Sequence, residues 1–177
     1  MKNFIAKRKT CFIIDVDGCL TTGQFLYSAK GKIMKVFGPD DADVLSILSD
    51  KINIKMVSGD KRGFAITKKR VDDMGFSLDL VSTFERVDYI KKKYKLDETI
   101  YMGDGIYDAL VFEKVGYSIA PANGFYITRQ KADFVTQAKG GEGAVAEACL
   151  HIMEKFFEKF DLSKLKIESS GAWEKGN

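Results

Sequence analysis

The chain has 177 residues, 45% of them hydrophobic and 30% charged, with a formal net charge of +3. This length suits one domain, and the composition is that of an ordinary globular protein. No apolar run approaches the roughly 20 residues that a membrane-spanning helix needs, and the charge is too dispersed for a nucleic-acid-binding surface. Together with a basic start that lacks the apolar stretch of a signal peptide, these features predict a cytoplasmic protein without membrane or nucleic-acid partners.

The first predicted strand is an apolar run that starts at Phe12 and ends in two acids, Asp15 and Asp17, followed by Gly18. Such a run is typical of a strand buried on both faces, and the glycine permits a sharp turn close to a ligand. Ligands of open α/β sheets bind at the carboxyl ends of strands, so both acids are expected where chemistry takes place. They would repel each other unless a cation joined them, which favours Mg²⁺. A plain Asp-Gly turn is the alternative.

Alternating residues from Gly23 to Phe37 predict a β-hairpin that projects from the sheet. Beyond it, helices alternate with strands, which predicts an α/β fold with a doubly wound parallel sheet. The predicted helices cover 38–49, 62–74, 84–94, 108–115 and 144 to about 160, and the predicted strands cover 53–57, 78–81, 99–102, 117–120 and 134–135. We expect a short turn near Phe125, and a tail that can move over residues 163–177.

Acid–base chemistry in this chain must fall to carboxylates. The single histidine, His151, lies in the last predicted helix, where a packing or surface role is expected. The three cysteines, Cys11, Cys19 and Cys149, are too few and wrongly spaced for a disulfide framework or a zinc site, so we expect reduced thiols.

Polar side chains follow three of the predicted strands. They are Asp15 and Asp17 after the first, Ser58 after the second, and Asp104 and Asp108 after the fourth. In this order they resemble the motifs of the haloacid dehalogenase superfamily of phosphohydrolases, and the resemblance extends from Cys11 to about Lys155. It implies a Rossmann-like domain of the haloacid dehalogenase type over residues 1–162.

The first motif, D-x-D-G-x-L-T, implies two catalytic acids. Asp15 would attack phosphorus and become an aspartyl phosphate, while Asp17 would protonate the departing alkoxide and then deprotonate the attacking water. ATP-driven pumps of the same superfamily carry threonine at the second acidic position, so Asp17 favours a hydrolase.

The segment from Gly103 to Asp108 matches the metal-binding signature G-D-x-x-x-D of the family. It implies that Asp104 binds Mg²⁺ together with the side chain of Asp15 and the backbone carbonyl of Asp17. Asp108 would orient a metal-bound water without binding the metal itself. The cation would offset the repulsion between a phosphate monoester and a nucleophilic carboxylate.

Phosphate binding is implied for Ser58, for the backbone N–H of Gly59 and for a basic residue. Ser58 could instead cap only its own helix. The family uses a lysine at the start of the helix before the fourth strand, and the closest position here holds Arg86. Arginine keeps the charge but differs in reach, so either Arg86 fills this role or Lys91 does so from one turn further along. A solvent-facing Arg86 is the alternative.

The intervals between the motifs are too short for the cap domain that many members insert. The chain therefore resembles capless sugar-phosphate phosphatases that act on acidic eight- or nine-carbon ulosonates and assemble as homotetramers through the hairpin. The segments 37–41, 121–127 and 140–145 carry this narrower resemblance. The glycine cluster 140–143 would be either an N–H nest over the sugar or a flexible entry to the last helix.

Asp60 and Lys61, directly after the second motif, are the predicted substrate-binding residues and favour the nine-carbon type. A carboxylate accepts hydrogen bonds from sugar hydroxyls, whereas the arginine of the eight-carbon type favours an anionic group. Lys68 and Arg70 are interpreted as ordinary surface charges, with a role in a neighbouring subunit's site as the alternative.

Other functions remain for the same fold. A catalytically silent oligomerisation or regulatory module of a sugar-activating system would be expected to have lost some of the four acids that this chain keeps. A phosphorylation-receiver domain places its acid pair a whole βα unit before the phospho-acceptor, which the D-x-D-G order contradicts. A phosphotransferase would need a cap to exclude water. A phosphatase for a different small phosphometabolite stays open.

Overall fold

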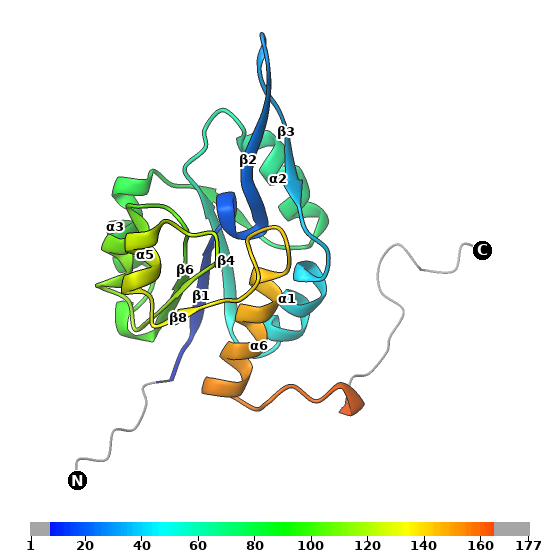
Figure 1. Ribbon diagram of the computed structural model, residues 1–177. Helices are drawn as coiled ribbons and strands as arrows, with labels where there is room; N and C mark the ends of the chain where they lie inside the picture. Colours follow the sequence, from blue (N-terminus) through cyan, green and yellow to red (C-terminus); the bar gives the residue numbers. More distant parts are fainter. Residues whose placement is uncertain (1–7, 165–177) are drawn as a thin grey trace.

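The computed structural model describes residues 8–164. Its centre is a six-stranded sheet in the order β5-β4-β1-β6-β7-β8, in which neighbouring strands are parallel (Figure 1). The strands are β1 (Cys11–Asp15), β4 (Asn53–Ser58), β5 (Leu78–Leu80), β6 (Thr99–Met102), β7 (Tyr117–Ala120) and β8 (Phe134–Val135). The parallel, doubly wound sheet expected from the sequence is therefore confirmed.

The winding of the chain reverses at β1. From β1 the chain moves to β4 and on to the edge strand β5, and it then crosses to β6 on the other side of β1 and continues to β7 and β8. In sheets of this kind, the carboxyl ends of the two strands at the reversal flank a crevice in which ligands bind. Here Asp15 ends β1 and Gly103 directly follows β6 at that point.

Helices cover both faces of the sheet (Figure 1). They are α1 (Asp41–Ser49), α2 (Phe64–Asp73), α3 (Arg86–Lys93), α4 (Asp108–Phe112), α5 (Tyr126–Lys131) and α6 (Ala144–Phe156). Residues of α1 and α6 pack with Phe12 and Ile14 of β1 in one buried cluster, and residues of α3 and α4 pack with Ile13 in another. Successive side chains of β1 thus point to opposite faces, and both faces are covered, which explains the continuous apolar run.

Several helices differ from their predicted extents, and α1 begins at Asp41, three residues later than predicted. The last helix ends at Phe156 instead of near residue 160, because Phe157 leaves the helical conformation, with φ −132° and ψ −119°. Phe157 and Phe160 then pack back against the core, which the continued helix would not allow. The chain forms the helix α5 after Phe125, where only a short turn was predicted, and α4 ends at Phe112, three residues early.

The predicted hairpin is confirmed. Its strands β2 (Thr21–Ser28) and β3 (Gly31–Phe37) form a separate antiparallel sheet that projects beyond the main one (Figure 1). A turn over residues 16–20 joins β1 to β2. Gly18 in this turn has φ +87°, and a Cβ atom there would lie 2.0 Å from Asp104 Oδ2. Only glycine lets the turn approach Asp104 this closely.

No cap domain is inserted within residues 8–164. The hairpin and α1 lie between the first two motifs, and α2, β5 and α3 lie between the second and the third. Of the predicted tail, residues 162–164 form a short 3₁₀ turn, and residues 165–177 lie outside the described part of the chain. In that described part, none of the helices has the length and apolar character needed to cross a bilayer.

The predictions for cysteine and histidine are confirmed. Cys11, Cys19 and Cys149 are buried free thiols. The ring of His151 stacks on Phe134 with the ring centroids 3.7 Å apart, so this histidine has a packing role at the β8 edge of the sheet.

Candidate active site

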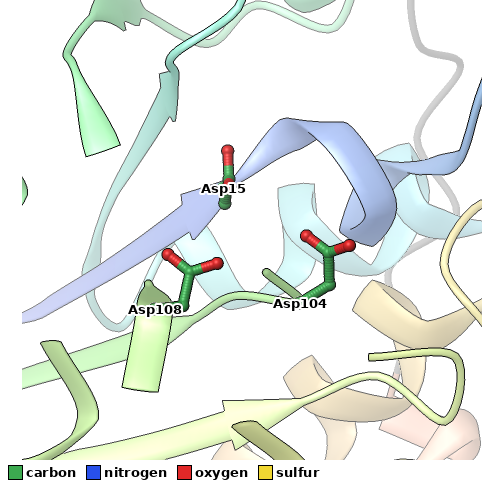
Figure 2. A group of neighbouring side chains, drawn as sticks. All are labelled: Asp15, Asp104 and Asp108. Atoms are coloured by element: carbon green, nitrogen blue, oxygen red, sulfur yellow. The ribbon is translucent and has the colours of Figure 1, made fainter. Parts of the chain in front are cut away.

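Three carboxylates meet at the point where the winding of the sheet reverses. Asp15 is the last residue of β1, Asp104 lies in the loop after β6, and Asp108 is the first residue of α4. One carboxylate oxygen from each lies within 4.8 Å of the other two, and Figure 2 shows the three side chains as neighbours that come from the end of β1, from the loop after β6 and from the start of α4. The structure thus brings together three acids that are far apart in the chain.

This acidic cluster, Asp15, Asp104 and Asp108, is short of positive charge. Burial raises the pKa of Asp15 to about 7 despite the nearby Arg86, and the charges of Asp108 and Asp17 add to the rise. Burial, together with the charges of Asp15 and Asp108, raises the pKa of Asp104 to about 8. Oδ1 of Asp15 is buried without a hydrogen-bond partner. Buried carboxylates with a spare oxygen are the ligands that a hard divalent cation prefers, so these residues fit such an ion.

Arg86 is the basic residue beside the cluster. Its side chain is 3% exposed, and Nη1 donates to Asp15 Oδ2 at 2.6 Å and to Asp108 Oδ1 at 2.7 Å. The solvent-facing alternative for Arg86 is therefore wrong. Lys91 is exposed on α3. The structure thus places Arg86, and not Lys91, against the predicted nucleophile.

Tyr101 is a polar partner that the sequence did not single out. It lies fully buried on β6, where its hydroxyl accepts from Arg86 Nη1 at 2.6 Å and donates to Asp108 Oδ1 at 2.7 Å. The other oxygen of Asp108 accepts from the backbone N–H of Gly105 at 2.9 Å. Both oxygens of Asp108 are thus held by the protein. This agrees with an orienting role for Asp108 rather than direct metal binding, a role that stays a prediction.

Asp17 lies outside the acidic cluster. Its Oδ1 accepts from Lys35 Nζ at 2.7 Å, and its Oδ2 accepts from Ser58 Oγ at 3.0 Å. Ser58 Oγ also accepts from the backbone N–H of Asp60 at 3.1 Å. Because α2 begins only at Phe64, Ser58 is not the cap of that helix. The predicted acid and the predicted phosphate-binding serine are therefore neighbours.

Gly59 packs closely against the same centre. A Cβ atom at Gly59 would lie 3.2 Å from Thr83 Oγ1 and 3.7 Å from Arg86 Nη2. The backbone after β4 therefore runs beside the guanidinium group of Arg86. Ser58, Gly59 and Arg86, predicted from different segments to bind phosphate, lie in one region of the structure.

The predicted substrate-binding acid is already paired within the chain. Asp60 forms ion pairs with Lys32 and Lys35 of β3, and its Oδ1 accepts from the N–H of Gly63 at 3.1 Å. Burial by itself would raise the pKa of Asp60, but the hydrogen bonds from the two lysines outweigh it and lower the pKa to about 2. Lys61 is exposed on the same turn. Substrate binding by Asp60 and Lys61 stays a prediction.

Of the two basic residues of α2, Lys68 forms an ion pair with Asp72 one turn along the helix at 2.8 Å. Both side chains are about half exposed, which agrees with an ordinary surface charge. Arg70 is partly buried near the end of the same helix. A role for either residue in a neighbouring subunit's site is not tested by one chain.

The glycine cluster at residues 140–143 is tied to the first motif. The N–H of Gly140 donates to Asn123 Oδ1 at 2.7 Å, and the N–H of Gly141 donates to the carbonyl of Cys19 at 3.0 Å. A Cβ atom at Gly140 would lie 1.8 Å from the carbonyl oxygen of Gly18, so the segment packs directly on the turn at residues 16–20. The N–H of Glu142 donates to the carbonyl of Lys139 at 2.9 Å, so three of the N–H groups expected to form a nest are used inside the protein. A hollow of about 260 Å³ adjoins this segment and is lined in part by Lys139.

Comparison with known proteins places this chain among hydrolases. Residues 83–148 match the family model of haloacid dehalogenase-like hydrolases. The 3-deoxy-D-manno-octulosonate 8-phosphate phosphatase of Haemophilus influenzae is 33% identical over 141 residues, covering 76% of this chain and 77% of the relative. The corresponding enzyme of Escherichia coli K12 is 31% identical over 147 residues, covering 77% and 75%.

Two solved structures are similar over most of the chain. The octulosonate phosphatase of Moraxella catarrhalis, in complex with magnesium, phosphate and the sugar, gives a TM-score of 0.74 at 30% identity and covers 84% of this chain and 88% of its own. The cobalt-bound enzyme of Haemophilus influenzae gives a TM-score of 0.74 at 30% identity, with 83% and 88% covered.

Proposed function

Because this chain belongs to the haloacid dehalogenase-like hydrolase family, we propose that it is a Mg²⁺-dependent phosphatase that hydrolyses the phosphate monoester of an acidic eight- or nine-carbon ulosonate. The observation that carries the proposal is the convergence of Asp15, Asp104 and Asp108 at the reversal of the sheet, with one buried oxygen of Asp15 unpartnered. Such a centre suits a divalent cation beside a carboxylate nucleophile.

The reaction we propose passes through an aspartyl phosphate. An oxygen of Asp15 attacks phosphorus, the bond from phosphorus to the sugar oxygen breaks, and Asp17 gives its proton to the departing alkoxide. Asp17 then takes a proton from water, which attacks phosphorus and releases phosphate and free Asp15. Arg86 holds Asp15 in place through its 2.6 Å hydrogen bond. Mg²⁺ bound by Asp15, Asp104 and the Asp17 carbonyl would neutralise charge on the transferred phosphoryl group.

The substrate choice rests on two different observations. The relatives and the Moraxella complex are named for the eight-carbon sugar, which favours 3-deoxy-D-manno-octulosonate 8-phosphate. The pair Asp60 and Lys61 is what favours a nine-carbon ulosonate. Since Asp60 is paired with Lys32 and Lys35, we place the eight-carbon sugar first.

We also infer a homotetramer assembled through the hairpin. Leu26, Tyr27 and Met34 of the hairpin are 50%, 59% and 53% exposed, and Leu26 pairs with Met34 across the two strands; exposed apolar side chains that lie together are typical of protein contacts. Light scattering coupled to size-exclusion chromatography measures the mass directly, and a monomer at micromolar concentration would contradict the inference. The cytoplasmic location expected from the sequence stays a prediction.

A phosphate-release screen tests the function. The substrates are octulosonate 8-phosphate, a nonulosonate 9-phosphate, glucose 6-phosphate and a solvent blank, each with Mg²⁺ and with a chelator. We expect Mg²⁺-dependent release that is fastest with one of the two ulosonates. Equal slow turnover of all three substrates would point to a different phosphometabolite, and no turnover of any would favour the catalytically silent module.

A further inference from the structure

The projecting hairpin places a buried lysine against the predicted general acid. None of the side-chain surface of Lys35 on β3 is exposed. Its Nζ donates to Asp17 Oδ1 and to Thr67 Oγ1, at 2.7 Å each, and lies 2.8 Å from Asp60 Oδ2. A lysine ammonium has three N–H donors, so these three contacts satisfy the group completely.

The side chain of Lys35 is buried, whereas those of the residues before and after it in β3 are exposed. Its neighbours Met34 and Val36 are 53% and 48% exposed, because successive residues of a strand point to opposite faces. A lysine is almost never fully buried unless its charge is paired, and desolvation of the ammonium group opposes its burial. The position of Lys35 therefore depends on the carboxylates of Asp17 and Asp60.

Of the two side chains that contact Asp17, we expect one to move away when substrate binds and the other to stay in place. Lys35 holds Oδ1, and Ser58 holds Oδ2. The family resemblance implies that Ser58 binds a phosphate oxygen of the substrate, and a turn of Ser58 toward that oxygen would release Oδ2. Lys35 cannot follow the substrate in the same way, because Thr67 and Asp60 hold it from α2 and from the loop after β4. Once substrate is bound, Lys35 is the contact that keeps the orientation of the carboxyl group.

We propose that Lys35 is a positioning residue for the general acid: it fixes Asp17 Oδ1, so that Oδ2 faces the oxygen of the leaving group. The proton on Oδ2 passes to that oxygen as its bond to phosphorus breaks and the electron pair stays with the oxygen. Lys35 keeps its three protons throughout. The hairpin would thereby form part of the active site. This inference rests on the proposed phosphatase function.

The test compares two leaving groups. Octulosonate 8-phosphate releases an alkoxide, which needs the proton of Asp17, whereas para-nitrophenyl phosphate releases a phenolate that departs without one. The ratio kcat/KM is the informative quantity, because it covers the steps up to departure of the leaving group and leaves out the later hydrolysis common to both substrates. For Lys35→Met we expect kcat/KM to fall about 100-fold with the sugar phosphate and less than about threefold with the aryl phosphate. An equal loss with both substrates, or no loss, would overturn the inference.

Lys32→Met is the matched control. Lys32 lies on the same strand, its side chain is 4% exposed, and it pairs with Asp60 without contacting Asp17. Any effect of Lys32→Met on kcat/KM is therefore expected to be the same for both substrates. A leaving-group preference in this variant as large as that of Lys35→Met would contradict a specific role for Lys35.

A double-mutant cycle asks whether Lys35 acts through Asp17. In the Asp17→Asn background, Lys35→Met is expected to change the ratio of the two kcat/KM values by less than about twofold, because residues that act as a unit are not additive. An undiminished second loss would show that Lys35 acts by another route. If Lys35→Met does not fold, as judged by circular dichroism, Lys35→Gln keeps a donor at this position, and it is expected to show a smaller loss of the same kind.

A crystal structure of the Lys35→Met variant tests the inference without an activity measurement. We expect the Asp17 carboxyl to lose its single orientation, with Oδ1 no longer directed at residue 35. One unchanged orientation would overturn the inference even if the wild-type protein released no phosphate, an outcome that would separately refute the proposed function.

Discussion

Two groups of acids lie on either side of the turn at residues 16–20. They differ in the number of basic side chains that pair with their carboxylates. The acidic cluster sets Asp15, Asp104 and Asp108 against one guanidinium group, that of Arg86. The hairpin group sets two carboxylates, those of Asp17 and Asp60, against the two buried lysines of β3.

The pKa values follow this difference. The pKa of Asp104 rises to about 8 through burial and neighbouring acids, whereas that of Asp60 falls to about 2 because the lysine hydrogen bonds outweigh burial. Excess negative charge at the first group leaves room for a divalent cation. Balanced charge at the second group favours a fixed geometry. The turn at residues 16–20 thus separates a group of acids with excess negative charge, where we propose a metal, from a charge-balanced group that holds the proposed general acid.

The largest expected effect comes from replacing the proposed nucleophile of the acidic cluster. Asp15→Asn removes the carboxylate that we assign as nucleophile, and phosphate release is expected to fall at least about 1000-fold in a steady-state assay. Asp72→Asn is a matched control, because Asp72 is exposed and its carboxylate pairs with Lys68 on the same helix. We expect that variant to keep full activity and to lose less than about 0.5 kcal/mol of stability. Activity of Asp15→Asn near that of the wild type would remove Asp15 from the role.

The second prediction removes Arg86, the cation that pairs with two acids of the acidic cluster. Arg86→Met leaves Asp15 and Asp108 without their buried partner, and breaking such a pair costs about 3–5 kcal/mol. Urea unfolding in the presence of a chelator measures the loss. Arg86→Lys, which restores the residue that the family uses, is expected to recover most of the stability. Equal losses in the two variants would show that shape, and not charge, matters at this position.

The third prediction concerns Asp41, a buried acid outside both groups, whose pKa is raised mainly by burial. Asp41 is 2% exposed, and its Oδ1 accepts from the N–H of Ala146 at 2.9 Å. Burial raises its pKa from 3.8 to about 6. Because the folded state then binds more protons than the unfolded state between these values, this group makes stability fall as pH rises from about 4 to 6 and leaves it constant above.

Urea titrations of the wild type and of Asp41→Asn at several pH values check this sign. The stability of the variant relative to the wild type is expected to increase by about 2 kcal/mol between pH 4 and pH 7. A difference that does not change with pH would mean that the carboxyl group of Asp41 titrates normally in the folded protein.

The fourth prediction concerns the metal. Mg²⁺ at 100 times its dissociation constant is expected to stabilise the wild type by about 2.7 kcal/mol. Asp104→Asn should lose this gain in thermal unfolding, since the amide offers one neutral oxygen in place of a carboxylate. Asp60→Asn, in the charge-balanced hairpin group, is expected to keep it. Loss of the gain in both variants would erase the distinction between the two groups.

The main elements and the acidic cluster could be predicted from the sequence, because the signals are local. The apolar run before Asp15 and the alternation of strands with helices imply a parallel sheet, and a parallel sheet brings the carboxyl ends of its strands to one edge. Asp15, Asp104 and Asp108 were therefore expected at one place, and the structure brings them together there. The hairpin followed in the same way from its alternating pattern.

What only the tertiary structure decided is which polar side chains become buried partners. Lys35 looks like any polar residue of an exposed hairpin, yet it is fully buried because α2 and the loop after β4 pack against that face. Tyr101 looks like a core residue of β6, and its hydroxyl reaches Asp108 and Arg86 only once α3 and α4 are in place. Periodicity along a chain reports which face of an element is apolar. The partner of a buried charge depends on how separate elements pack, which no local pattern records.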